Sequence, residues 1–219
     1  MSTMSVESPV SAKIAEDIRR MREIALEIVA QGETCNPYYE IVQKYLYKDM
    51  ERYFRFDLRD QCIGAFGFAI PDLRAIQMIA KLKKVVEIGA GSGYWAWLLN
   101  QRGVDVRAYD NRSRGRGAMY WDYHWGYVEI DNHGVLLSTP PEYALMLCWP
   151  EYEESQAVDS LKAFKGNDVI YVGEREGGCT GDDKFFRLLA KNWTMTAEHA
   201  IPTFPGIHDQ LQIYHRKAA

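Results

Sequence analysis

The sequence predicts an α/β fold with a mostly parallel sheet, and three observations carry this prediction. Short apolar runs typical of strands alternate with helical patterns from about residue 70 onward. A glycine-rich turn follows the first of these strands. The last two expected strands are separated by a short connection containing Pro205 and Gly206, which predicts a terminal antiparallel hairpin on the sheet.

The N-terminal third has a different pattern. Apolar residues recur every three or four positions from Ser11, which predicts an amphipathic helix that Gly32 ends. A second helical stretch follows Asn36 and Pro37 and runs into the aromatic and basic segment 52–56. We expect residues 1–10 to form a loose polar tail and residues 11–69 to form a helical cap beside the sheet.

The remaining elements belong to one domain, residues 70–219. After a loop at 64–70, Pro71 is placed to open a helix through about residue 82. The expected strands cover 85–89, 104–110, 143–149, 168–172, 193–201 and 210–215. The expected helices between them cover 94–101, 153–164 and 182–192.

Composition narrows the class of protein. A chain of 219 residues with 47% hydrophobic and 26% charged residues is expected to fold as one domain plus an extension. Its formal net charge of −4 does not favour nucleic acid as a partner. The four cysteines lie far apart without a CxxC pair, so we expect free thiols and no structural zinc. Without a signal peptide or a membrane span, we expect a cytoplasmic protein and no membrane partner.

The glycine-rich turn is the strongest functional signal. Glu87, Gly89, Gly91 and Gly93 stand in the order E-x-G-x-G-x-G directly after an apolar strand. Alternating glycines permit a close backbone approach to a ligand, and the following helix N-terminus presents unpaired N–H groups. A dinucleotide site requires a glycine where this sequence has Tyr94, so the spacing argues against NAD.

An acid follows at the expected distance. Asp110 lies 21 residues after Gly89 and ends the next predicted strand, where a carboxylate accepts hydrogen bonds from a ribose diol. Such a turn is sometimes structural, and a fold alone does not establish an activity. Strand, turn, helix, strand and acid in this order nevertheless favour a nucleoside site.

The segments VVEIGAGSGYWAWLL and VRAYD resemble motifs I and II of the class I S-adenosylmethionine-dependent methyltransferases. The resemblance covers residues 70–216 and implies a Rossmann-like, seven-stranded, mostly parallel sheet with S-adenosyl-L-methionine as cofactor. It implies that Glu87 lies near the amino-acid portion of the cofactor, that the glycines line it, and that Asp110 holds the ribose. The expected cofactor-binding residues are Glu87, Gly89, Ala90, Gly91, Gly93, Tyr94, Trp95, Asp110, Asn111, Cys148 and Trp149.

The segment after the fourth strand departs from the family pattern. Amino-methylating relatives often have Asn/Asp-Pro-Pro-Tyr there, whereas this chain has Trp149-Pro150-Glu151-Tyr152, which argues against adenine methylation in nucleic acid. Trp149 or Tyr152 can face the cofactor or the acceptor through a ring, and a cation–π contact with the sulfonium is one such role. Packing of Trp149 in the core is an equal alternative.

Two further segments supply candidates for acceptor binding and proton transfer. Arg112, Arg114 and Arg116 suit a carboxylate or phosphate, or else form a solvated loop. The aromatic cluster at 120–125 suits a substrate wall, with His124 as general base oriented by Asp122, or as a surface group. His208, followed by Asp209, is either a second acid/base candidate or a turn cap.

These observations favour methylation of nitrogen or oxygen on a small molecule, with His124, Tyr152 and His208 as catalytic candidates. The aromatic loop and the cap suit enclosure of a small acceptor. An RNA or protein methyltransferase is the first alternative, since the arginine loop and segment 53–59 are basic. A protein that binds the cofactor without transferring a methyl group is the second.

Overall fold

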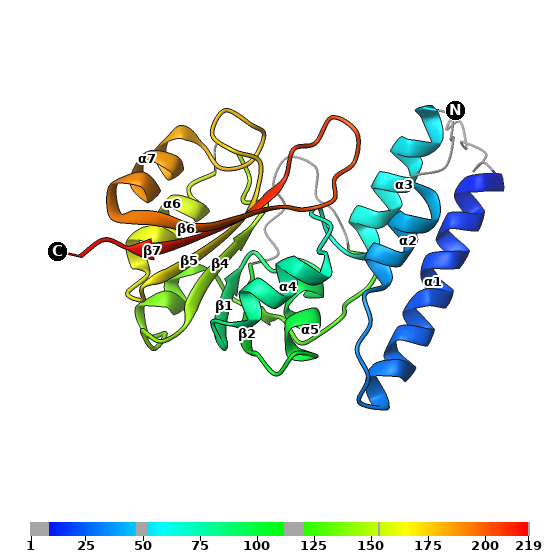
Figure 1. The fold of residues 1–219 in the computed structure, drawn as a ribbon, viewed down its shortest axis with the longest axis horizontal. Coiled ribbons are helices and arrows are strands. Elements are labelled where there is room, and N and C mark those ends of the chain that lie inside the picture. The colour runs from blue at the N-terminus through cyan, green and yellow to red at the C-terminus, as the bar shows by residue number, and fades with distance from the viewer. Residues whose placement is uncertain (1–8, 47–51, 112–120, 153, 219) are drawn as a thin grey trace.

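The computed structural model describes residues 9–46, 52–111, 121–152 and 154–218, with the backbone alone at 52–55 (Figure 1). Within this part of the chain, one seven-stranded sheet has the order β3-β2-β1-β4-β5-β7-β6. Its strands are β1 (Lys84–Ile88), β2 (Asp105–Asp110), β3 (Glu129–Ile130), β4 (Ala144–Cys148), β5 (Asp168–Gly173), β6 (Trp193–Ala200) and β7 (Gln210–Arg216).

The sheet confirms the predicted fold class. Strands β3, β2, β1, β4 and β5 are parallel, and β7 lies antiparallel between β5 and β6. The six strands predicted from residue patterns begin and end within one residue of their expected bounds. Strand β3 was not among them, because two exposed residues are too short to show an alternating pattern.

The helices that cover the sheet are α4 (Leu73–Ala80), α5 (Tyr94–Asn100), α6 (Gln156–Ala163) and α7 (Asp183–Asn192), with a short 3-10 helix, η1 (His133–Leu137). Helix α4 begins later than predicted because Asp72, and not Pro71, determines its start. The Asp72 carboxylate accepts a hydrogen bond from Ala75 N at 2.7 Å and so caps the first turn. Helix α6 also begins later than expected, at Gln156.

Alternate side chains of β1 face two apolar layers. Val85 packs with α4 and α5 on one face of the sheet. Val86 and Ile88 pack on the other face with η1, α6 and α7. Figure 1 shows α4 and α5 on one side of the sheet and α7 on the other. This burial on both faces is typical of a parallel sheet.

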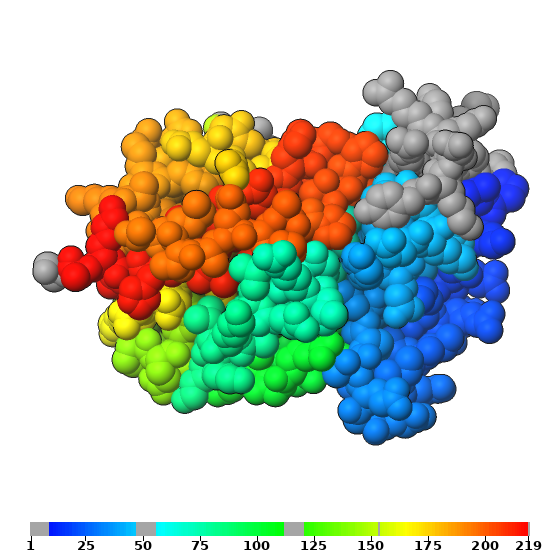
Figure 2. Space-filling view, in the orientation of Figure 1, coloured from blue at the N-terminus to red at the C-terminus, as the bar shows by residue number. Residues whose placement is uncertain are grey.

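The cap consists of α1 (Pro9–Ala30), α2 (Pro37–Tyr45) and α3 (Arg52–Ala65). Helix α1 begins two residues before its expected start, because proline is well suited to the first position of a helix. Ile14, Ile41 and Leu58 are fully buried in the same apolar cluster that contains Val85 of β1. The cap therefore shares a core with the sheet, and Figure 2 shows its surface running into that of the neighbouring helices.

The cap lies beyond the carboxyl ends of the parallel strands (Figure 1). Just after α3, the carbonyl of Phe66 accepts a hydrogen bond of 2.6 Å from the hydroxyl of Ser92, which belongs to the glycine turn. The carboxyl edge is where open α/β sheets bind their ligands. The cap is therefore positioned beside any ligand held at that edge.

Three other properties bear on function. No helix in the described ranges is long and apolar enough to cross a membrane. Among the same residues, no group of His, Cys, Asp and Glu side chains is arranged to hold a metal ion. Cys35, Cys62, Cys148 and Cys179 are free thiols.

Candidate functional site

The glycine turn is fixed to the end of the neighbouring strand. Gly89, Gly91 and Gly93 have φ values of 77°, 56° and 76°, in the left-handed region that favours glycine. The amides of Gly89 and Ala90 both donate to the carbonyl of Tyr109 in β2, at 2.8 and 3.0 Å. The turn that connects β1 to α5 is thus held directly beside Asp110.

Asp110 closes the turn from the other side. One oxygen of its half-buried carboxylate accepts a hydrogen bond of 2.9 Å from the amide of Gly91. The glycines and the acid that the sequence predicted as one site are therefore adjacent. Asn111, the next predicted residue, is exposed.

Glu87 lies beneath the turn and is only 1% exposed. Burial, and then the negative charge of Asp110, raise the pKa of Glu87 from 4.5 to about 8, against the lowering effect of the backbone N–H of Ala96. Its Oε2 atom is buried and has no hydrogen-bond partner among the described residues. A buried carboxyl oxygen without a partner favours a ligand that brings a donor, and an ammonium group would also favour the ionised form.

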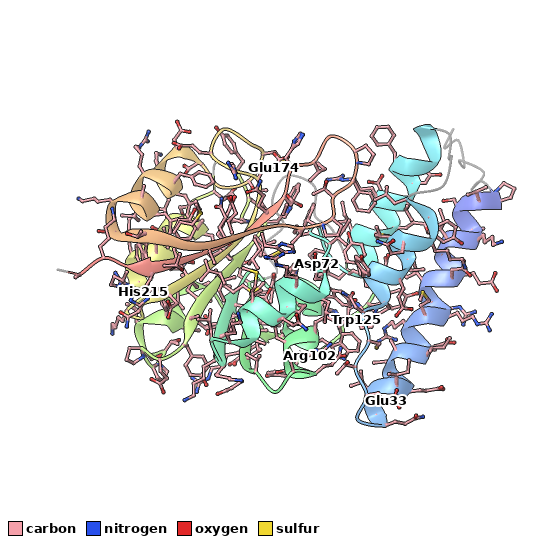
Figure 3. The ribbon with its side chains drawn as sticks, viewed as in Figure 1. Glu33, Asp72, Arg102, Trp125, Glu174 and His215 are labelled. Carbon is pink, nitrogen blue, oxygen red and sulfur yellow. The ribbon has the colours of Figure 1, made fainter. Side chains whose placement is uncertain are left out.

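An aromatic loop packs over the same turn. A Cβ atom on Gly91 would lie 2.5 Å from Cζ2 of Trp121, so the indole ring lies directly against this glycine. The amide of Trp125 donates to the carbonyl of Ser92 at 3.0 Å, and its indole N–H donates to the carbonyl of Ala65 at 2.7 Å. Figure 3 shows Trp125 between the cap and α5. The predicted aromatic wall thus borders the turn, while Tyr120 and the arginines at 112, 114 and 116 lie outside the described residues.

Tyr94 and Trp95 open α5 and are buried. The Tyr94 hydroxyl donates to Oδ1 of Asn36 at 2.8 Å and accepts from the amide of Tyr38 at 3.0 Å. The Tyr94 ring also contacts Phe66 and Trp125 edge-on. The bulky residue that replaces the dinucleotide glycine therefore joins the cap to the turn.

Trp149 has an unusual backbone at the end of β4. Its φ is 50°, and its amide donates to the carbonyl of Val172 at 2.8 Å. Its indole N–H donates to Oδ2 of Asp209 at 2.8 Å, and its ring stacks on Phe68 with centroids 4.7 Å apart and planes 10° apart. Cys148, the residue before it, has a buried thiol whose pKa is raised by burial and then by the charges of Glu87 and Asp209.

The chain aligns with solved methyltransferase structures at low sequence identity. One is the magnesium protoporphyrin IX methyltransferase ChlM from Synechocystis with bound SAM, at 11% identity and a TM-score of 0.46 over 99% of this chain and 100% of that chain. Another is the N-methyltransferase NodS from Bradyrhizobium japonicum in complex with S-adenosylhomocysteine, at 12% and 0.44 over 83% and 99%. A third is an rRNA methylase from Streptococcus thermophilus, at 15% and 0.42 over 66% and 96%. No family profile and no curated protein sequence matches the chain.

The order of the strands identifies the architecture. Five parallel strands, an antiparallel β7 between β5 and β6, and a glycine turn after β1 are the arrangement implied by the sequence resemblance. The chain has a Rossmann-like α/β fold with this strand order. The turn and Asp110 occupy the carboxyl edge of β1 and β2, where this fold has its ligand crevice.

The structure does not bring the three catalytic candidates together. His124 is exposed, and its backbone carbonyl accepts a hydrogen bond of 3.2 Å from Arg22 of α1. The Tyr152 side chain is also exposed. The ring of His208 is 82% exposed, with Nδ1 3.5 Å from Glu174. No hydrogen bond or ring contact in the described part of the chain joins any two of them, and their catalytic roles stay predictions.

Residue patterns did not identify one side chain that the structure places at this edge, and they did not rank a second. Phe68 lies in a stretch expected to be a loop, and its ring contacts both Trp121 and Trp149. Asp209 was predicted only jointly with His208, as an acid/base candidate or a turn cap, yet it is the buried one of the two, at 3% exposure. The available signal for Asp209 was a single acid directly before a strand in which Leu211 and Ile213 alternate with polar residues, because burial of such an acid requires a partner.

Proposed function

We propose that the protein is an S-adenosylmethionine-dependent methyltransferase that acts on nitrogen or oxygen of a small-molecule acceptor. The observation that carries this proposal is the glycine turn fixed beside Asp110, with the unpartnered carboxyl oxygen of Glu87 beneath it. These groups match the polar parts of a nucleoside amino acid.

Each residue of the turn has a role that its position supports. Asp110 would accept hydrogen bonds from the ribose hydroxyls, and Glu87 would pair with the ammonium group. The left-handed φ values of Gly89, Gly91 and Gly93 hold the turn in a backbone shape that other residues rarely adopt, with the Trp121 ring against Gly91. When bound, the sulfonium supplies an activated methyl group. The protein then has to position the acceptor and exclude water, which supplies much of the rate enhancement in such reactions.

A small acceptor is supported by the surroundings of the turn. The cap and the residues at 121–125 pack against it, and three of these residues are aromatic. The net charge of −4 disfavours a phosphate backbone as partner. The free thiols support a reducing, cytoplasmic location.

The test of the cofactor is calorimetry with S-adenosylmethionine, S-adenosylhomocysteine and NADH. We expect both sulfur nucleosides to bind and NADH not to bind, because Tyr94 fills the position of the third dinucleotide glycine. Asp183→Asn, on the exposed face of α7, is a control that should bind like the wild type. Failure of both sulfur nucleosides to bind would contradict the proposal.

The acceptor class is tested by measuring formation of S-adenosylhomocysteine with small phenols, amines and azoles, with unmodified RNA, and with a protein extract. We expect turnover with members of the small-molecule set alone. Salt-sensitive turnover with RNA would favour the nucleic-acid alternative. Tight nucleoside binding without turnover in any of the three sets would favour a non-catalytic binding protein.

A further inference from the structure

An aromatic row runs from the glycine turn to the end of β4. The ring of Trp121 lies against Gly91. Phe68 meets Trp121 edge-on, with centroids 6.3 Å apart and planes at 90°, and stacks on Trp149 with centroids 4.7 Å apart. All three rings are half-buried. The row therefore connects the proposed cofactor turn to a second place on the sheet edge.

A buried carboxylate lies at the far end of this row. Asp209 immediately precedes β7 and is 3% exposed. Its Oδ2 accepts the indole hydrogen bond of Trp149, while its Oδ1 is buried and has no hydrogen-bond partner among the described residues. A polar atom in that condition is costly to the fold unless a ligand satisfies it.

The neighbouring acid, Glu174, differs in this respect. Figure 3 shows Glu174 at the end of β5 nearer the cap, with His215 toward the opposite end of the sheet. One Glu174 oxygen accepts from the amide of His208 at 2.9 Å, and the other accepts from the amide of Cys179 at 2.8 Å. Both of its oxygens are therefore satisfied, so Glu174 has a structural role that accounts for its burial. Asp209, with one unpartnered oxygen, has no structural role that accounts for its burial in the same way.

The backbone of Trp149, the hydrogen-bond partner of Asp209, is strained. Trp149 has a φ of 50°, a conformation that a bulky residue rarely adopts. Its amide, its indole N–H and its ring are each fixed, by Val172, Asp209 and Phe68 respectively. Strain that the surroundings hold in place is concentrated at functional sites.

The two carboxylates flank a common neighbour. The charges of Glu87 and Asp209 both raise the pKa of the Cys148 thiol, which ends β4 between them. Trp149, the hydrogen-bond partner of Asp209, directly follows Cys148, and Gln210 after Asp209 pairs with Gly173 at the end of β5. Asp209 therefore lies at the same edge of the sheet as the proposed cofactor turn, which is where an acceptor would lie.

We infer that Phe68, Trp149 and Asp209 form the acceptor site, and that the acceptor is a planar aromatic compound whose reacting nitrogen or oxygen carries a proton. This inference rests on the proposed function. Phe68 and Trp149 stack on each other, so it is the outer face of this half-buried pair that selects a flat ligand, because aromatic rings stack with an offset or meet edge to face. The unpartnered Oδ1 of Asp209 accepts the hydrogen of its N–H or O–H group.

The chemistry balances without another reactant. The lone pair of the acceptor atom forms a bond to the methyl carbon, and the carbon–sulfur bond breaks with its electron pair moving to sulfur. The acceptor proton passes to Oδ1 of Asp209, which later returns it to water. The products are the methylated acceptor and S-adenosylhomocysteine.

The charges around Asp209 suit this role. Burial, and then the charge of Glu174, raise the pKa of Asp209 to about 7, while the indole of Trp149 and the positive charges of Arg59 and His208 lower it. A base whose pKa lies near the working pH exchanges protons efficiently. Burial raises the pKa of the Cys148 and Cys179 thiols, and the charge of Asp209 raises both further.

The test measures binding to the full-length protein saturated with S-adenosylhomocysteine. Saturation-transfer NMR compares phenol, catechol, benzimidazole and indole with their saturated counterparts cyclohexanol and cyclohexylamine. We expect the aromatic compounds to bind and the saturated ones not to bind. Asp209→Asn should weaken aromatic binding at least tenfold, and Glu176→Gln, an exposed acid two residues after Glu174, should leave it unchanged.

Phe68→Leu is the second variant, because Asp209→Asn can disturb folding through its bond to Trp149. It should also weaken aromatic binding at least tenfold, and circular dichroism together with nucleoside calorimetry checks both variants. Two results would overturn the acceptor site alone, provided that nucleoside affinity is normal. One is that no aromatic compound binds to the wild type, and the other is that both variants bind the aromatic compounds as tightly as the wild type does. Absence of nucleoside binding would instead overturn the proposed function.

Discussion

The two halves of the proposed site are built in opposite ways. The nucleoside half comes from one continuous segment, β1, the glycine turn, α5 and β2, and its backbone bonds join residues close in sequence. The acceptor half brings together Phe68, Trp149 and Asp209, and the last two lie 60 residues apart in the chain. The first half is therefore a local structure, whereas the second exists only after the sheet and hairpin have formed.

This difference predicts how each half responds to substitution. The nucleoside half depends on backbone conformation, so changes at its glycines should affect folding as well as binding. The acceptor half depends on side chains that meet across the sheet edge. Substitutions there should affect one ligand while the other still binds.

The largest effect is expected for Gly91→Ala. The new Cβ would lie 2.5 Å from the Trp121 ring on a backbone with φ of 56°. Left-handed strain and overpacking together should lower the free energy of unfolding by about 2 to 5 kcal/mol. Urea denaturation measures the change.

Gly103→Ala is the matched control for that experiment. Its φ is 72°, but no atom lies within 4 Å of the position of a new Cβ. Gly103→Ala should lower the free energy of unfolding only through backbone strain, by about 1 to 2 kcal/mol. Equal losses in both variants would show that Trp121 does not press on Gly91.

The next effect is expected for Asp110→Ala. Loss of charge-assisted hydrogen bonds to the ribose should weaken nucleoside binding by about 1 to 3 kcal/mol. Calorimetry with S-adenosylhomocysteine measures it at constant salt. Unchanged affinity in a folded variant would show that Asp110 does not bind the nucleoside. The nucleoside half would then not be formed by this one continuous segment.

Per pH unit, a smaller effect is expected from the pH dependence set by Glu87. Its pKa is raised from 4.5 to about 8, so between these values the folded protein holds a proton that the unfolded chain has lost. Stability from this group is therefore full below pH 4.5 and falls as pH rises toward 8, by at most about 1.4 kcal/mol per pH unit. Glu87→Gln should show a correspondingly weaker decline in urea titrations across this range.

The same proton provides a test of ligand orientation. An ammonium group beside Glu87 would lower its pKa, so binding of S-adenosylhomocysteine near pH 7 should release up to about one proton. Calorimetry in buffers of different ionisation enthalpy measures this release. Adenosine, which has no ammonium group, should release none, and equal release by both ligands would place the amino-acid portion elsewhere.

The same contrast explains what could be predicted from the sequence. The positions of six strands, the glycine turn and Asp110 were accessible because each depends on neighbouring residues and on a known spacing. Strand β3 was too short to show a pattern, and the start of α4 depended on a cap at Asp72 rather than on Pro71. The buried Asp209 is paired with Trp149, 60 residues earlier in the chain, which no local pattern connects to it.

The smallest effect on the fold is expected for His124→Gln, which tests whether an exposed residue of the aromatic loop belongs to the acceptor half. Its contact with Arg22 uses the backbone carbonyl, which the substitution retains. Unfolding free energy should therefore change by less than about 0.5 kcal/mol, and nucleoside affinity should not change. If His124 is the general base, the rate of methyl transfer loses part of its pH dependence in this variant. If Asp209 alone takes the proton, the pH profile of His124→Gln overlays that of the wild type, so the two bases are distinguished by one measurement.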